Sequence, residues 1–314
     1  MENKRLEYIL KRKKIRKQKQ IIRLTILLVG LVAAVFLIIS AINSIVSAIQ
    51  KAIPTPTPTP VSIVSEFGEL KSTIAHSGEI TQIQEPSLSY NSLPNPTEEA
   101  DVIKYLEANS TNKKVCYLTF DDGPNKTITS QILDILRRYN IKATFFQVGT
   151  LIEENPDVSR RVYEEGHLIG NHSYDHTYEK MYSGKDGFME EFDLCAKLIK
   201  NITKEDYVPI MRLPGGSHNT GTYGEIKQEI IQILSEKGVY HCNWNALSGD
   251  AESSYKTKSQ LIERIKSTSK GKNQVVVLMH DASTKKQTVE ALPEIIEYFI
   301  SEGYVFSRLD RPMF

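Results

Sequence analysis

The sequence is organised around KVCYLTFDDGP, residues 114–124. Its first half is a run of apolar, β-branched and aromatic residues, which is typical of a buried strand. The run ends in two adjacent carboxylates, Asp121 and Asp122, and then in Gly123-Pro124, a dipeptide that favours a turn. Because neighbouring strand residues point to opposite faces, we expect the two carboxylates to have different partners and different functions. Taken alone, the stretch could also be a polar turn after a purely structural strand.

Strand-like and helix-like segments alternate regularly after this stretch, which predicts a βα architecture. The further predicted strands are residues 143–148, 167–170, 209–213, 239–244, 274–279 and 304–308. The predicted helices between them are residues 127–138, 155–165, 186–199, 223–237, 259–266 and 288–301. About 200 residues are few for a full eightfold barrel, which usually needs about 250. The expected fold class is therefore α/β, a distorted or incomplete (β/α) barrel.

The N-terminal part differs from the rest. Residues 1–20 contain nine Lys or Arg, and residues 24–50 contain no charged residue. An apolar segment of this length can cross a bilayer, which takes about 20 residues, and the basic cluster before it is expected to stay in the cytoplasm. A cleaved signal peptide is the alternative, although its apolar core usually has only about 7–15 residues. We expect a cytoplasmic segment over residues 1–20 and a single transmembrane helix over residues 21–50.

A spacer follows the predicted membrane helix. Residues 54–60 alternate proline and threonine, which favours an extended and stiff conformation. The chain then stays rich in Ser, Thr, Glu and Pro, apart from a short helix predicted over residues 97–108 with Thr97 as its N-cap. We therefore expect a stalk over residues 51–112 and a catalytic domain over residues 113–314, outside the membrane.

The charge and cysteine content exclude some functions. Residues 1–23 hold ten basic and two acidic residues, so 29 of the 39 basic and 36 of the 38 acidic residues remain for the rest of the chain. This mildly acidic remainder lacks the basic footprint of a nucleic-acid-binding protein. The three cysteines, Cys116, Cys195 and Cys242, cannot all pair within one chain, and we expect them to be buried free thiols.

Charged and imidazole groups recur at the predicted C-terminal ends of the strands, which converge on one mouth in a barrel. They are Asp121, Asp122, His172, His176, Arg212, Asp250 and His280. His172 and His176 are four residues apart, a spacing that lets both imidazoles reach one metal ion from a helical turn. Two histidines and one carboxylate form a familiar open ligand set for Zn²⁺. Either Asp121 or Asp122 can supply the carboxylate.

Five motifs now identify a resemblance. TFDDGP, NHSYDH, RLPGGS, WNALSGDA and VLMHD follow one another in the order and approximate spacing of the polysaccharide deacetylase family. Over residues 114–308 the chain resembles the NodB-homology domains of carbohydrate esterase family 4. The resemblance implies a distorted (β/α) barrel that holds a divalent metal ion and hydrolyses the acetamido group of an N-acetylated polysaccharide.

The resemblance also implies a role for each motif residue. The metal ligands would be Asp122, His172 and His176, the catalytic base Asp121 with Arg212 orienting it, the catalytic acid His280 with Asp250 supporting it, and the oxyanion donor the main-chain N–H of Gly215. The expected ion is Zn²⁺, with Co²⁺, Ni²⁺ and Mn²⁺ as alternatives. Gly215 and Ala251 stand where the family often has aromatic residues, so we expect a wider or differently lined groove. Trp244 can either line that groove or pack in the core.

The expected function is hydrolysis of N-acetyl groups on peptidoglycan N-acetylglucosamine, by an enzyme anchored in the cell membrane with its catalytic domain outside. Exopolysaccharides, chitin-like oligomers and O-acetylated sugars are alternative substrates. A non-catalytic sugar-binding domain is an alternative from another class. The presence of both a candidate base, Asp121, and a candidate acid, His280, argues against it, because sugar binding alone needs neither.

Overall fold

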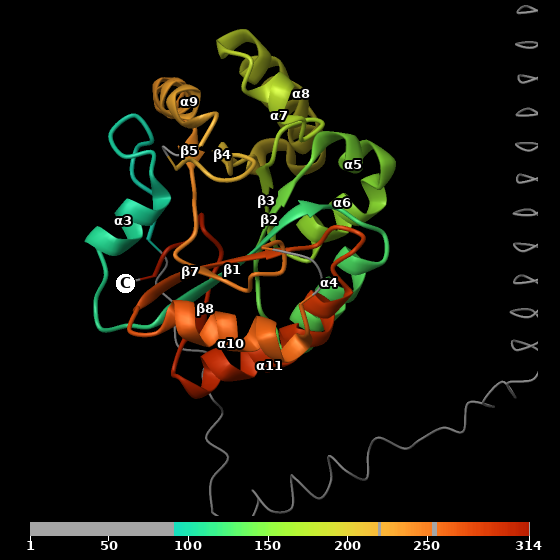
Figure 1. The fold of residues 1–314 in the computed structure, drawn as a ribbon, viewed down its shortest axis with the longest axis vertical. Coiled ribbons are helices and arrows are strands. Elements are labelled where there is room, and N and C mark those ends of the chain that lie inside the picture. The colour runs from blue at the N-terminus through green and yellow to red at the C-terminus, as the bar shows by residue number, and fades with distance from the viewer. Residues whose placement is uncertain (1–90, 219–220, 253–255, 314) are drawn as a thin grey trace, which may run out of the picture. The chain divides into compact units, whose positions relative to one another are not determined.

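The computed structural model describes residues 91–218, 221–252 and 256–313, which build an eight-stranded sheet surrounded by helices (Figure 1). Every strand pairing is parallel, and the order is β5-β4-β3-β2-β1-β7-β6, with β8 paired to the start of β1. The strands are β1 (Val115–Gly123), β2 (Thr144–Gln147), β3 (Leu168–Asn171), β4 (Ile210–Met211), β5 (Tyr240–His241), β6 (Ala246–Leu247), β7 (Gln274–His280) and β8 (Val305–Phe306).

The sheet is strongly curled, as the connection between its two edge strands requires. β5 ends at His241 and β6 begins at Ala246, although they lie at opposite ends of the strand order. A flat path of seven strands would hold these edges about 29 Å apart at about 4.8 Å per strand. The five residue steps between them reach at most about 18 Å. The sheet therefore bends round into an incomplete barrel, and the expected α/β fold class is confirmed.

Helices surround the curled sheet (Figure 1). They are α3 (Val102–Ala108), α4 (Ile128–Arg138), α5 (Gly149–Glu154), α6 (Pro156–Glu164), α7 (Tyr178–Met181), α8 (Lys185–Thr203), α9 (Gly224–Glu236), α10 (Lys258–Ser269) and α11 (Lys286–Ser301), with a 3₁₀ turn at Lys204–Asp206. The helix α4 shows how these helices are held against the sheet. It buries Ile132, Leu133 and Leu136 completely, and each such side chain contributes about 1.5–3 kcal/mol through burial.

β1 separates the two sides of the sheet. Cys116, Leu118 and Phe120 belong to the large cluster that also contains the buried helix residues, whereas Val115 and Tyr117 belong to a second cluster. This alternation follows from the two-residue period of a strand. Continued along the strand, it places Asp121 on the same side as Tyr117, inside the curled sheet.

Most predicted elements are present, and three short ones were not predicted: β6, α5 and α7. The first helix also starts later than expected, at Val102. The side chain of Asp101 accepts hydrogen bonds from the main-chain N–H groups of Ile103 (3.0 Å) and Lys104 (3.3 Å), so Asp101 is the N-cap. The side chain of Thr97 donates instead to Asn95, at 2.9 Å.

Residues before 113, which the sequence assigned to the end of the stalk, contact the barrel. The main-chain N–H of Asn91 donates to the Pro312 carbonyl oxygen at 2.8 Å, and that of His241 donates to Ala100 at 2.8 Å. Val102 and Leu106 of α3 are buried in the second cluster. The end of the expected stalk is therefore part of the barrel.

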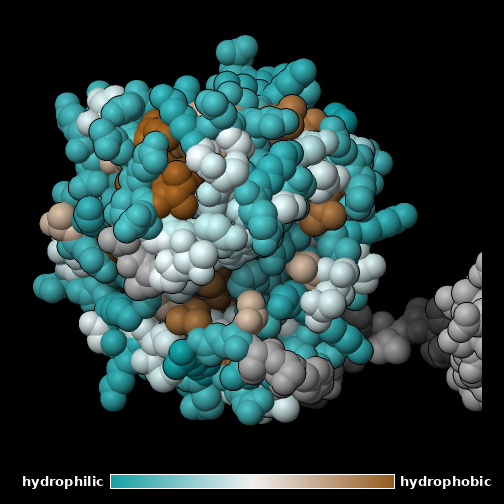
Figure 2. Space-filling view, turned by 45° about the horizontal axis from the view of Figure 1, so that its top comes forward, coloured by the Kyte–Doolittle hydropathy of each residue, from teal (hydrophilic) through white to brown (hydrophobic). Residues whose placement is uncertain are grey.

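The predicted cytoplasmic segment and transmembrane helix, residues 1–50, and the stalk up to residue 90 lie outside the described residues. Within the described part, no helix is long and apolar enough to cross a bilayer. The three cysteines are free and buried, as predicted. The face shown in Figure 2 is largely hydrophilic with small, separate hydrophobic areas.

The contribution of α3 can be measured. Leu106→Ala should lower the free energy of unfolding by about 2–5 kcal/mol, because it leaves a cavity in a buried cluster. Lys104→Ala, on the exposed face of the same helix, should change it by no more than about 0.5 kcal/mol. Urea denaturation of the two variants measures both values. Equal stability of the two variants would show that α3 is not part of the core.

Candidate active site

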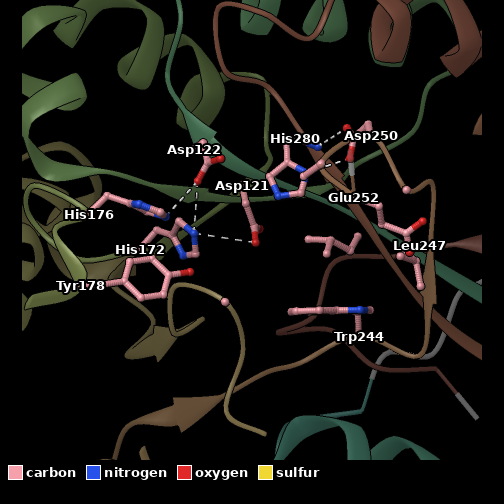
Figure 3. Close-up of a pocket in the computed structure, with 14 residues that line it drawn as sticks. Asp121, Asp122, His172, His176, Tyr178, Trp244, Leu247, Asp250, Glu252 and His280 are labelled. Atoms are coloured by element: carbon pink, nitrogen blue, oxygen red, sulfur yellow. Dashed lines mark hydrogen bonds and ion pairs between the residues drawn. The ribbon is translucent and has the colours of Figure 1, made fainter. Parts of the chain in front are cut away.

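A pocket of about 610 Å³ opens at the C-terminal ends of the strands. Seven of the eight residues that the sequence singled out line it: Asp121, Asp122, His172, His176, Gly215, Asp250 and His280. The eighth, Arg212, is fully buried and hydrogen-bonded to Asp121. Figure 3 shows the two histidines of the third strand's loop on one side of the pocket and His280 with Asp250 on the other.

Asp122, His172 and His176 form a compact donor set, with one ligand atom of each within 4.8 Å of the others. Asp122 Oδ1 lies 3.4 Å from His172 Nε2 and 3.2 Å from His176 Nε2. His172 Nδ1 is 2.8 Å from the carbonyl oxygen of Arg212. That oxygen can only accept, so Nδ1 carries the hydrogen and the Nε2 lone pair faces the other two donors. Two imidazoles and a carboxylate fit a divalent ion such as Zn²⁺.

The electrostatics favour Asp122 over Asp121 as the third donor. Burial raises the pKa of Asp122, but the nearby imidazoles of His172 and His176 outweigh burial and hold this pKa well below its usual value. Asp121 lies further from the histidines, with 3.8 Å between its Oδ2 and His172 Nε2. Its other oxygen is hydrogen-bonded to Arg212.

Three residues in or next to the donor set have a backbone conformation that residues other than glycine rarely adopt. The φ angles of Asp122, Ser173 and His176 are +70°, +68° and +63°. Left-handed conformations of this kind cost non-glycine residues about 1–3 kcal/mol each and collect at functional sites. Here they bring Asp122, near the end of β1, close to His176, in the loop after β3.

Arg212 fixes the candidate base. Its guanidinium is fully buried, and its Nη1 donates to Asp121 Oδ1 at 2.8 Å. Three further donors are satisfied by Thr119 Oγ1 at 2.6 Å and by the carbonyl oxygens of Cys242 at 2.9 Å and Asn243 at 2.8 Å. Because the pair is charge-assisted and enclosed, it holds one oxygen of Asp121 in place and leaves the other facing the pocket.

His280 and Asp250 form a second pair opposite the donor set. His280 Nδ1 is 2.8 Å from Asp250 Oδ1, and the main-chain N–H of His280 donates to Asp250 Oδ2 at 2.9 Å. Burial lowers the pKa of His280, but the hydrogen bond and charge of Asp250 outweigh it and raise this pKa to about 9. The other nitrogen of the imidazole points toward Asp121 (Figure 3). In the β1–β7 ladder, Asp121 and His280 are direct neighbours.

Asp281, the other acid near His280, faces away from this pair. Its Oδ2 accepts a hydrogen bond from Thr129 Oγ1 at 2.6 Å, and burial raises its pKa to about 7. It therefore does not take the place of Asp250 beside the imidazole.

Sequence reasoning missed several residues of the pocket wall: Tyr178, Leu247, Glu252 and Leu278. Tyr178 is the most informative. Its ring lies 5.8 Å from that of His176, and a Cβ at Gly215 would come within 2.5 Å of its hydroxyl oxygen. The position of Tyr178, two residues after a predicted ligand, was a usable signal. Trp244, which the sequence left undecided, lines the pocket.

Comparisons with known proteins agree with this geometry. The family model described as "Polysaccharide deacetylase" matches residues 108–239. A peptidoglycan-N-acetylglucosamine deacetylase of Bacillus cereus is 31% identical over 196 residues, which cover 62% of this chain and 86% of that protein. A bifunctional xylanase/deacetylase of Pseudobutyrivibrio xylanivorans is 37% identical over 200 residues, which cover 63% of this chain and only 30% of that protein.

Solved structures show the same fold. The catalytic domain of a peptidoglycan N-acetylglucosamine deacetylase from Eubacterium rectale has a TM-score of 0.59 and 33% identity, covering 66% of this chain and 96% of that chain. The fold and the pocket define an α/β catalytic domain with a candidate metal site. The chain belongs to the polysaccharide deacetylase family, as its motifs indicated.

The donor set leads to a first prediction at this site. His172→Ala or His176→Ala should reduce bound metal from about one divalent ion per chain to a small fraction, because each removes one of three donors. His218→Ala, an exposed histidine beside Trp244, should keep the metal. Elemental analysis of the purified variants gives the occupancy. Full occupancy in either ligand variant would refute the donor set.

The His280–Asp250 pair leads to a second prediction at this site. His280 donates as an acid only while protonated, and the form that Asp250 stabilises is lost as pH rises through a pKa of about 9. Asp250→Asn removes this stabilisation but keeps the burial, so the alkaline limb of the kcat–pH profile should move to lower pH. The profile is measured with metal content alongside. An alkaline limb that stays in place would show that Asp250 does not support the acid.

Proposed function

We propose that this protein is a metal-dependent N-deacetylase of a cell-wall polysaccharide, with peptidoglycan N-acetylglucosamine as its substrate. One observation carries the proposal: a carboxylate and an imidazole, Asp121 and His280, are neighbours on adjacent strands and face a three-residue donor set in one pocket. Amide hydrolysis needs both an acceptor for a proton of water and a donor for the leaving amine.

The first half of the reaction needs water activated against the acetamido carbonyl. A divalent ion held by Asp122, His172 and His176, with Zn²⁺ as our choice, would polarise that carbonyl and lower the pKa of water. Asp121 takes the proton of the attacking water on the oxygen that Arg212 leaves free. The main-chain N–H of Gly215, which lines the pocket, donates to the oxygen that gains negative charge at the carbonyl.

The second half breaks the C–N bond. His280 transfers the proton of its pocket-facing nitrogen to the amine nitrogen, since an unprotonated amine is a poor leaving group. Its other nitrogen keeps its hydrogen bond to Asp250 throughout, so the ring stays oriented. The products are acetate and the free amine of the sugar, and general acid catalysis of this kind contributes about 10²–10⁴-fold.

The setting of the enzyme supports a wall polymer as the substrate. We infer that the basic residues 1–20 stay in the cytoplasm, that residues 21–50 cross the cell membrane, and that a stalk carries the catalytic domain outward. A tether and spacer of this kind would hold the pocket near a polymer just outside the membrane. The name of the Bacillus cereus relative supports the same substrate.

Acetate release distinguishes the candidate substrates. The purified protein is incubated separately with intact peptidoglycan, N-acetylglucosamine oligomers and acetyl-xylan. The proposal expects the highest kcat/KM on peptidoglycan. Faster release from acetyl-xylan would make the protein an O-deacetylase, an outcome in line with the name of the xylanase/deacetylase relative. No release from any substrate would leave a sugar-binding domain.

The adjacent acids allow their roles to be separated. Asp121→Asn should keep the metal but lower kcat by about 10²–10⁴-fold, because it removes the proton acceptor. Asp122→Asn should weaken metal binding, because an amide is a poorer ligand than a carboxylate. Metal titration and acetate release on both variants measure these effects. The reverse pattern would exchange the two roles.

A further inference from the structure

Glu191 of α8 is a buried carboxylate that the proposed reaction does not use. Its side chain is fully buried. Its Oε2 accepts hydrogen bonds from the main-chain N–H groups of Tyr174 at 3.0 Å and Asp175 at 2.9 Å. Both residues lie between His172 and His176, so Glu191 binds the turn that joins two of the three candidate metal ligands.

Lys180 balances the charge of Glu191. Its Nζ lies 2.5 Å from Glu191 Oε1 and 3.6 Å from Asp175 Oδ2. A buried carboxylate without partners would cost several kcal/mol. Glu191 thus has two amides on one oxygen and an ammonium beside the other, and these contacts hold its carboxylate in place.

The turn between the histidines needs support of this kind. Ser173 and His176 both have left-handed backbones, at φ +68° and +63°. Such conformations persist only where the surroundings over-determine them. In addition, the carbonyl oxygens of Ser173 and Tyr174 accept from the N–H groups of Gly149 at 3.0 Å and Thr150 at 2.8 Å. The turn is therefore held between α5 and α8.

We propose that Glu191 is a positioning residue that preorganises the turn carrying His172 and His176 for a divalent cation. Without it, the two N–H groups would lose their shared acceptor and His176 would sample orientations that point away from Asp122. The cation would then bind only the fraction of molecules with the ligands in place. This inference rests on the metal centre of the proposed function and adds a residue to it.

The test compares two neighbouring glutamates on α8. Glu191→Gln keeps the shape but removes the charge, whereas Glu190→Gln makes the same change on an exposed side chain. The Zn²⁺ dissociation constant of each full-length variant is measured by competition with a chromophoric chelator. Loss of a residue that orients metal ligands typically weakens affinity by about 10–100-fold, and this is expected for Glu191→Gln alone. Hydrogen exchange in the metal-free protein should speed up at the Tyr174 and Asp175 amides.

Wild-type Zn²⁺ affinity in folded Glu191→Gln would overturn the positioning role while leaving the proposed function intact. A wild-type protein that binds no divalent ion would overturn both. If Glu191→Gln does not fold, Glu191→Asp decides, because it keeps the charge but is one methylene too short to reach both amides. Weakened Zn²⁺ binding by that folded variant supports the inference, and wild-type affinity refutes it.

Discussion

The buried ion pair between Arg212 and Asp121 is the interaction on which both the barrel and the pocket depend. Taking two charges out of water is favourable only when every donor and acceptor finds a partner, and breaking such a pair typically costs about 3–5 kcal/mol. Arg212 meets this condition by donating to Thr119 and Asp121 of β1 and to the carbonyl oxygens of Cys242 and Asn243. The last two belong to the four-residue link that joins the edges of the curled sheet. One guanidinium thus ties the closure of the barrel to the orientation of the candidate base.

The same arrangement explains how two adjacent aspartates acquire different chemistry. Asp121 continues the inward face of β1 and contacts Arg212, whereas Asp122 has a left-handed backbone near the end of β1 and contacts two imidazoles. Different surroundings commonly give neighbouring acidic residues different catalytic roles. Asp281, the next acid along the chain from His280, is different again: it is fully buried, it accepts from Thr129, and burial raises its pKa to about 7.

The sequence was sufficient to predict most of the strands and the polar residues at their ends. Apolar runs and the polar residues that follow them are local signals. The sequence was not sufficient for β6, which has only two residues. The side chain of Asn245, just before β6, accepts from the Val276 N–H at 2.9 Å and donates to the Gln274 carbonyl at 3.0 Å. Glu191 was equally hidden, since nothing in its helix shows that it will meet a loop seventeen residues earlier.

The pocket wall illustrates how a side chain missing at one position can be replaced by a side chain from elsewhere in the chain. The resemblance led us to expect a missing wall at Gly215, yet the hydroxyl of Tyr178 lies where a side chain at 215 would begin. The two positions compete for one volume, so a larger residue at 215 and a tyrosine at 178 cannot both be accommodated without movement. Because Tyr178 lies two residues after His176 and its ring contacts that imidazole, the same loop contributes both a candidate metal ligand and a wall of the pocket. A shift of this loop would therefore change the metal centre and the shape of the pocket together.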